Sequence, residues 1–182
     1  MKVPQQNLKS LIDIVYPNIN VVGMCNDNYL SERTILASRN QDVDCINQII
    51  LNILSGNQRI YDSADSTIIE EDRVIEARIL CGDYAGQLTF IPCITLNPST
   101  TELPIVFKRR QFPVRVAYAM TINKSQGQSV KHVGLDLRTP VFLHRQLYVA
   151  LSRCTSPNSI KILFPQNSTN TVTTNIVYLK FF

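Results

Sequence analysis

The sequence has no apolar run approaching the about 20 residues that a membrane-spanning helix requires. Residues 1–19 contain no compact apolar block followed by small residues, which argues against a secretory signal. The cysteines are five scattered residues that form no C-x-x-C pair: Cys25, Cys45, Cys81, Cys93 and Cys154. We therefore expect neither a disulfide framework nor a zinc site, but reduced and mostly buried thiols.

Charge is sparse, at 18% of residues, and it is unevenly distributed along the 182-residue chain. Residues 1–104 carry 7 Lys/Arg against 13 Asp/Glu, whereas residues 105–153 carry 9 Lys/Arg against a single acid, Asp136. Such a basic block is typical of a chain that binds a polyanion. A solvated basic face is the alternative interpretation, and charge alone does not decide between them.

The first half of the chain predicts part of a β-α-β unit. Apolar spacing indicates a helix over 8–19, a buried strand over 34–38 and a helix over 42–54. Arg39 and Asn40 fall where the strand meets the helix, which is the edge at which open α/β sheets bind ligands. A simple capping turn is the alternative.

The middle of the chain predicts short strands. Residues 73–80 and 87–94 alternate around a glycine-containing turn and predict an antiparallel hairpin, and 59–65 and 103–108 are further candidate strands. Period-two alternation predicts a strand over 112–120.

A polar segment, 121–128, follows that strand and predicts the start of a helix capped by Thr121. Free N–H groups there, the charge of Lys124 and the neutral groups of Ser125, Gln126 and Gln128 suit a phosphodiester backbone. A bland capped turn is the alternative. Beyond it we expect a strand over 130–137, a helix over 142–153 and a strand over 159–164.

Two segments resemble motifs V and VI of superfamily 1 DNA helicases of the petite-integration-frequency (Pif) type, including the helicase part of Helitron transposases. They are N-K-S-Q-G-Q at 123–128 and L-Y-V-A-L-S-R at 147–153. Residues 35–47 resemble motif IV, 102–115 the lead-in to motif V, and N-I-V-Y at 175–178 the family's C-terminal end.

The resemblance implies an α/β fold, the second RecA-like domain of such a helicase, with a mostly parallel sheet flanked by helices. It implies that 1–72 and 105–182 form this domain and that 73–104 is the remnant of an inserted β subdomain, reduced to a hairpin. Family members carry several tens of further residues near Glu71–Arg73, which this chain lacks.

The resemblance also implies roles for individual residues. Candidates for contact with single-stranded DNA are Thr121, Asn123, Lys124, Ser125, Gln126 and Gly127, together with Arg39 and Asn40. Arg153 matches the arginine finger that acts on the ATP phosphates, and a place in the last turn of a helix, where it complements the dipole, is the alternative. Gln146 lies seven positions earlier, on the face that we expect Arg153 to share, and is a candidate for orienting the site.

Other parts of the family's nucleotide site have no match here. No glycine is followed by lysine, so the G-x-x-x-x-G-K-[ST] phosphate cradle is absent, and no apolar run ends in Asp-Glu. The partners implied are single-stranded DNA and a first RecA-like domain outside this chain. ATP and Mg²⁺ are cofactors of the full-length family, and we expect neither to bind this chain alone.

These features leave three hypotheses. The chain is the C-terminal fragment of an ATP-dependent 5′-to-3′ DNA helicase involved in DNA repair, recombination or telomere maintenance, acting in the nucleus or the mitochondrion. Alternatively, it is a non-catalytic module that binds single-stranded DNA through its basic block. The third hypothesis is a transposon-derived remnant that folds but has no function.

We predict that the purified chain hydrolyses no ATP, because an arginine finger without a phosphate cradle has no bound nucleotide on which to act. A phosphate-release assay should give the rate of the buffer blank, with and without DNA. Hydrolysis above the blank that Arg153→Ala abolishes would contradict this prediction.

Overall fold

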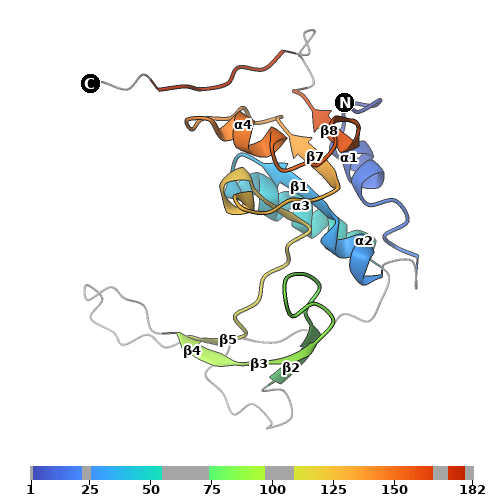
Figure 1. Cartoon of the computed structure of the whole chain (residues 1–182), viewed down its shortest axis with the longest axis vertical. Helices are drawn as coiled ribbons and strands as arrows, with labels where there is room; N and C mark the ends of the chain where they lie inside the picture. The colour runs from blue at the N-terminus through green and yellow to red at the C-terminus, as the bar shows by residue number, and fades with distance from the viewer. Residues whose placement is uncertain (1, 22–25, 55–73, 97–108, 166–171, 179–182) are drawn as a thin grey trace. The chain divides into compact units, whose positions relative to one another are not determined.

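The computed structural model describes residues 2–21, 26–54, 74–96, 109–165 and 172–178 (Figure 1). The chain forms two compact units. The first is discontinuous and combines 1–55 with 116–182, and the second is the insertion 56–115.

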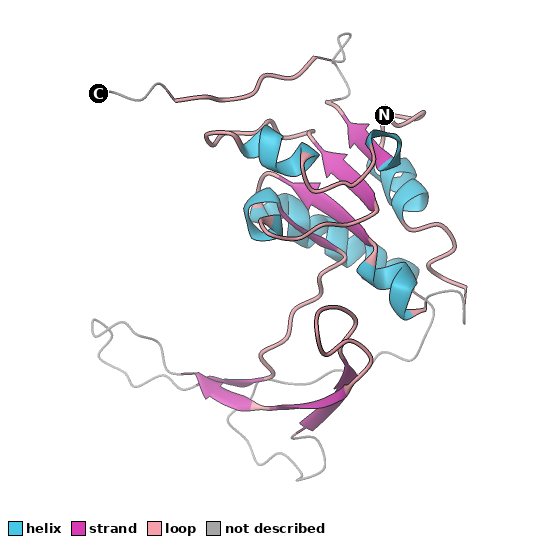
Figure 2. Ribbon diagram, viewed as in Figure 1, coloured by secondary structure: helices cyan, strands magenta, loops and turns pink. Residues whose placement is uncertain are grey.

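A parallel four-stranded sheet is the centre of the first unit (Figure 2). Its strands, in the spatial order β6-β1-β7-β8, are β6 (Ala119–Thr121), β1 (Arg33–Ala37), β7 (His132–Asp136) and β8 (Ile160–Leu163). Both faces of the central strand β1 are covered, which explains why its sequence is an almost continuous apolar run. The α/β class and the parallel sheet predicted from the sequence are confirmed.

Helices cover the sheet on both sides. On one face α1 (Leu8–Val15) and α3 (Asn40–Ile53) pack against Ile35 and Ala37 of β1. On the other face the 3₁₀ turn η2 (Ile122–Ser125) and α4 (Gln146–Leu151) pack against Leu36 of β1 and the apolar side chains of β7. Two short elements, α2 (Asp27–Ser31) and η3 (Pro157–Ser159), precede β1 and β8 respectively.

Gly134 in β7 allows α1 to approach the sheet closely. A Cβ at this position would lie 2.8 Å from Cγ2 of Val15 and 3.2 Å from Cδ1 of Leu11. Both side chains belong to the apolar face of α1 and are buried. Because core packing leaves no room for an added methyl group, this strand position requires glycine.

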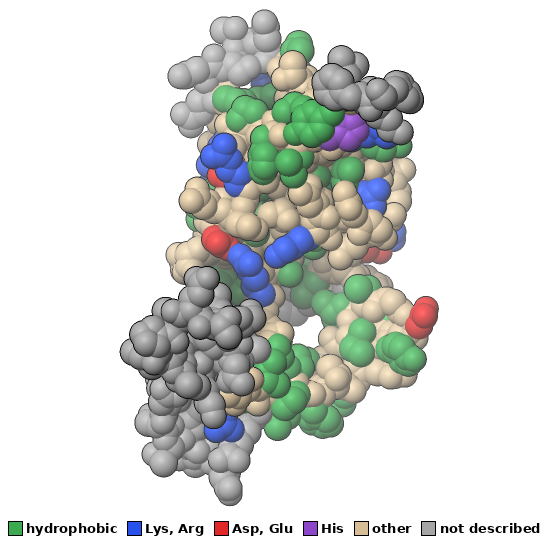
Figure 3. Space-filling model, turned by 90° about the vertical axis from the view of Figure 1, so that its left-hand side faces the viewer, with side chains coloured by type: hydrophobic (Ala, Val, Ile, Leu, Met, Phe, Trp, Pro, Cys, Tyr) green, Lys and Arg blue, Asp and Glu red, His purple; other side chains and the backbone are tan. Residues whose placement is uncertain are grey.

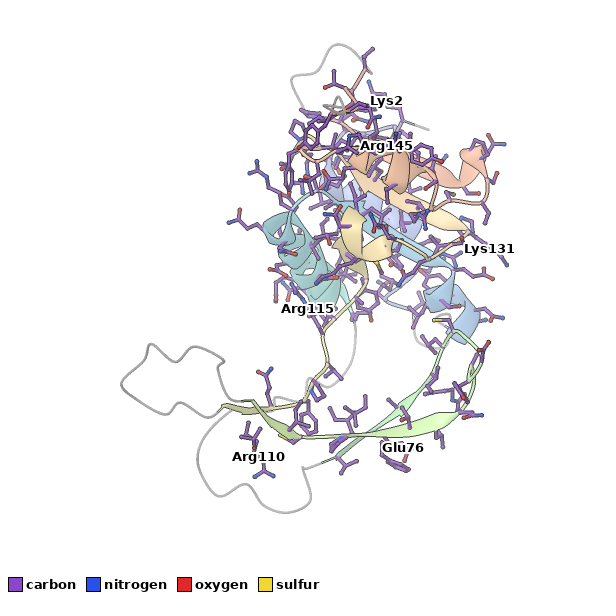
Figure 4. The ribbon with its side chains drawn as sticks, turned by 60° about the vertical axis from the view of Figure 1, so that its left-hand side comes forward. Lys2, Glu76, Arg110, Arg115, Lys131 and Arg145 are labelled. Carbon is purple, nitrogen blue, oxygen red and sulfur yellow. The ribbon has the colours of Figure 1, made fainter. Side chains whose placement is uncertain are left out.

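The second unit consists of strand pairs in its described part. β2 (Val74–Arg78) pairs antiparallel with β3 (Leu88–Pro92), and β4 (Ile94–Leu96) pairs antiparallel with β5 (Arg109–Gln111). Gly82 and Gly86 have φ of +87° and +89° in the turn between β2 and β3. Figure 4 labels Glu76 on β2 and Arg110 on β5. The predicted hairpin is thus confirmed, while 59–65 and 103–108 lie outside the described residues.

The predicted strand over 112–120 is wrong for most of its length, because only Ala119–Thr121 is a strand. Residues 112–118 have no regular structure, and they include Pro113, which has no N–H to donate to a sheet. Val114 is 53% exposed. The alternation arises where the chain passes from the second unit to the first.

Two further expectations are corrected by the structure. The helix predicted over 142–153 is only Gln146–Leu151, because Arg145 before it is left-handed, with φ of 56°. The described cysteines are less buried than expected: Cys45 and Cys81 are exposed, and Cys93 and Cys154 are half-buried. Within the part of the chain that the structure describes, no helix is long and apolar enough to span a membrane, and no cluster of side chains suits a metal ion.

We predict that Gly134→Ala lowers the free energy of unfolding by about 1–3 kcal/mol, the usual cost of overpacking a core. Urea denaturation followed by circular dichroism measures this change. Val15→Ala removes the methyl group that clashes, so the double variant should lose less stability than the sum of the two single variants. Strict additivity would show that the close approach to α1 is not the reason for the glycine.

Candidate nucleic-acid interface

The carboxyl ends of β1, β6 and β7 lie side by side. Ala37, the last residue of β1, is in register with Thr121, the last residue of β6, and with Asp136, the last residue of β7. The segments that follow these strands therefore start from one edge of the sheet. Arg39 and Asn40 follow β1 and therefore start from the same edge of the sheet as the loop 121–128.

The loop 121–128 begins with a single 3₁₀ turn instead of the predicted helix. Thr121 is at the N-cap position, but its side chain makes no capping hydrogen bond. Ile122 is fully buried in the core, and the hydroxyl of the buried Ser125 donates to the Ile122 carbonyl at 2.6 Å. Ser125 therefore supports the loop from inside, and its hydroxyl does not face solvent.

The exposed residues of this loop are polar or flexible. Asn123, Lys124, Gln126 and Gly127 are exposed, and Gly127 has φ of +83°, a conformation that favours glycine. Lys124 supplies the positive charge, and the two amides supply neutral donors and acceptors. Thus four of the six residues that motif V suggested are displayed at the surface, while Thr121 is half-buried and Ser125 is buried.

Arg153 joins the end of α4 to this loop. Its guanidinium donates through Nη1 to the carbonyl of Gln128 at 3.0 Å and to that of Ser125 at 3.5 Å. Nε donates to the carbonyl of Val149, and Nη2 to the hydroxyl of Ser152. In this structure the candidate arginine finger is therefore a brace that joins the segment 147–153 to the loop 121–128.

Gln146 does not share a face with Arg153, contrary to the expectation. It is 1% exposed, and its Oε1 accepts hydrogen bonds from the N–H groups of Phe142 and Leu143. The physical reason is the short helix: residues 142–145 form a turn, and the Gln146 carboxamide bonds to the free N–H groups of that turn. Gln146 consequently fixes the entry to α4, and Arg153 lies beyond its end.

Arg39 and Asn40 are exposed at the start of α3. Arg39 makes no side-chain capping bond, and its guanidinium carbon lies 5.9 Å from the centroid of the Phe142 ring. That separation is at the limit of a cation–π contact. Arg39 is the N-cap residue of α3, so its position fits the capping turn that was the alternative, although its side chain makes no capping bond.

Arg138 is a residue of this edge that the sequence analysis missed. It follows the end of β7 and donates from Nε and Nη2 to the carboxylate of Asp136, with Nη2 at 2.7 Å from Oδ2. This hydrogen bond raises the pKa of Arg138. The rule that singled out Arg39, a position just beyond a buried strand, could have found Arg138 too.

Asn47 was also missed, although it positions the edge strand β6. Its buried carboxamide accepts from the N–H of Ala119 at 2.8 Å and donates to the carbonyls of Ala119 and Val116. These bonds satisfy backbone groups that β1 does not reach, since Ile35 of β1 already donates to the Tyr118 carbonyl. Asn47 therefore fixes the position of β6, from which the loop 121–128 begins.

Internal partners use part of the basic block. Lys131 pairs with Glu32, Arg138 pairs with Asp136, and Arg153 bonds to backbone carbonyls. The pKa of Glu32 is lowered by its hydrogen bond with Lys131. In the view of Figure 3, Lys and Arg side chains form separate patches instead of one continuous stripe. The surface charge is smaller than the sequence count indicates.

We predict that Arg153→Ala accelerates amide hydrogen exchange at Gln126–Gln128 by several-fold, because the loop loses the donors that hold two of its carbonyls. Mass spectrometry of peptides covering 120–130 measures the change. Lys131→Ala is the matched control, since it removes a cation at the end of the same loop whose partner is Glu32. Equal protection of the loop amides in the wild type and in Arg153→Ala would contradict the claim that Arg153 holds the loop.

Sequence comparison finds relatives over part of the chain. It is 33% identical to the ATP-dependent DNA helicase Pif1 of Campylobacter jejuni over 125 residues, 65% of this chain and 26% of that protein. It is 45% identical over 117 residues to the ATP-dependent DNA helicase PIF1 of Saccharomyces cerevisiae, 64% of this chain and 13% of that protein. The chain thus spans about a quarter or less of these relatives. No family model matches it.

Solved structures share the fold. The chain superposes on Bacteroides Pif1 bound to ssDNA with a TM-score of 0.55 and 22% identity, covering 86% of this chain and 45% of that one. A second Bacteroides Pif1 structure, in complex with ADP-AlF3 and ssDNA, gives a TM-score of 0.55 over 95% of this chain and 47% of that one, with 18% identity.

The sequence relatives, the shared fold and the adjoining motif segments agree on one family. The similarities support a Pif1-type superfamily 1 helicase, of which this chain covers only a part.

Proposed function

We propose that this chain binds single-stranded DNA through the exposed surface of the loop 121–128 and the adjoining residues Arg39 and Asn40. The observation that carries the proposal is the arrangement of this loop. Ile122 and Ser125 fix it from below, Arg153 braces it, and Lys124 and the amides of Asn123 and Gln126 stay exposed.

The chemistry of these groups suits contact with phosphates. One ammonium and several neutral donors can bind backbone oxygens without reading bases, as phosphate contacts generally do. Two structures with the same fold are described as Bacteroides Pif1 with ssDNA, which supports the same ligand class here. Tyr118, an aromatic residue just before β6, adds little to base stacking, because it is half-buried and packs edge-on against Tyr16 with ring centroids 5.8 Å apart.

The residues of this chain do not fit an ATP site of their own. The sequence has no phosphate cradle, and the Arg153 guanidinium uses Nε, Nη1 and Nη2 in hydrogen bonds within the chain. In a complete helicase, Arg153 would have to exchange some of these bonds for a phosphate held by another domain. On the family resemblance we further propose 5′-to-3′ polarity and a role in DNA repair, recombination or telomere maintenance, in the nucleus or mitochondrion.

We predict weak binding of a fluorescent oligothymidylate that declines steeply with salt, because counterion release from phosphates supplies the affinity. For single strands each phosphate contact contributes about −0.7 to the slope of log K against log [salt]. Lys124→Ala should therefore reduce the slope by about 0.7. Fluorescence anisotropy between 50 and 200 mM salt, roughly the range over which the effect is large, measures both quantities.

Lys9→Ala is the matched control for this experiment. Lys9 is exposed on α1, which packs on the sheet face opposite to η2 and α4, so its loss changes net charge equally without touching the loop. It should leave the slope unchanged. Equal effects of the two substitutions would show that the affinity comes from net charge and not from the loop. No binding at all would favour a folded domain without function.

A further inference from the structure

The C-terminal segment Asn175–Tyr178 lies against the turn that precedes α4. The N–H of Arg145 donates to the carbonyl of Ile176 at 2.8 Å. The N–H of Tyr178 donates to Nδ1 of His144, also at 2.8 Å. Figure 1 draws the segment in red above α4. Two hydrogen bonds in opposite directions thus connect adjacent residues of the turn to the segment.

His144 and Tyr178 also stack. Their ring centroids are 5.3 Å apart, and the ring planes differ by 23°. Because Nδ1 accepts the bond from Tyr178, the hydrogen of the neutral imidazole belongs on Nε2. The pair therefore combines a directional hydrogen bond with a ring contact, and each can be removed separately by substitution.

The turn that this segment contacts has a conformation that is unfavourable on its own. Arg145 has φ of 56° and ψ of 15°, a left-handed conformation that costs energy in residues with a Cβ. It makes no side-chain capping bond to α4. In this conformation the N–H groups of Phe142 and Leu143 donate to the carboxamide oxygen of Gln146, the first residue of α4.

We propose that Asn175–Tyr178 is a strap that holds the left-handed turn at Arg145, with His144 and Tyr178 as the positioning pair that fastens it. By fixing this turn the strap sets the start of α4, the helix whose other end leads to Arg153. The strap acts within the chain and does not depend on DNA binding, so the two proposals can fail separately.

Two substitutions of His144 separate its contributions. His144→Phe keeps an aromatic ring for the stack but removes the acceptor. His144→Asn places an oxygen near the position of Nδ1 but removes the ring. Residue-resolved amide exchange of the full-length chain by NMR should show Tyr178 and Arg145 exchanging roughly fivefold to tenfold faster in His144→Phe, the factor that one hydrogen bond contributes. In His144→Asn, Tyr178 should keep most of its protection.

Arg145→Gly tests positioning as distinct from simple contact, since glycine adopts positive φ readily. With arginine at position 145, His144→Phe should also accelerate amide exchange at Phe142 and Leu143 several-fold. In the Arg145→Gly background those two amides should keep their protection while Tyr178 still loses its own. Buried amides of β7, such as those of Val133 and Leu135, should be unchanged in every variant and confirm folding.

Two results would overturn the proposal that this segment holds the turn at Arg145. One is unchanged exchange at Arg145 and Tyr178 in His144→Phe. The other is equal loss of protection at Phe142 and Leu143 with arginine or glycine at position 145, which would show that the segment contacts the turn without positioning it.

Discussion

The candidate interface depends on the hydrogen bonds between Arg153 and the backbone of the loop after β6. Ile122 and Ser125 attach the beginning of this loop to the core, but its far end has few buried side chains. The guanidinium of Arg153 bonds to the carbonyl of Gln128 and so determines where the exposed amides and Lys124 lie. One residue near the end of α4 thereby links a surface suited to DNA with a cation suited to phosphate.

The chain's own residues supply only part of what the proposed site would need. The chain offers a loop for a polyanion and an arginine that another anion could attract, but it contains no cradle to hold a nucleotide beside that arginine. Any anion that attracts Arg153 would compete with the carbonyls of Ser125 and Gln128. Engagement of Arg153 elsewhere would thus alter the loop that we propose to bind DNA, and this gives a physical route for coupling the two ligands.

The sequence was informative where one physical effect dominates. Apolar runs identified β1, β7 and β8, because strands buried on both faces need such runs. The motif segments drew attention to the loop and to Arg153, but the contact between them was not predicted. Alternation misled over 112–120, where Pro113 and an exposed Val114 show that no sheet forms. Asn47 acts through tertiary hydrogen bonds to β6, whereas Arg138 and Gln146 make local bonds to residues two to four positions away; none of these bonds leaves a periodic signal.

The most direct test of this account is an NMR titration of the ¹⁵N-labelled chain with a short oligothymidylate. The account predicts that chemical-shift changes concentrate at Thr121–Gln128 and at Arg39 and Asn40, with small changes at Arg153 transmitted through its bonds to the loop. Shift changes confined to the strands of the second unit, or spread evenly over basic residues on both faces of the sheet, would contradict it.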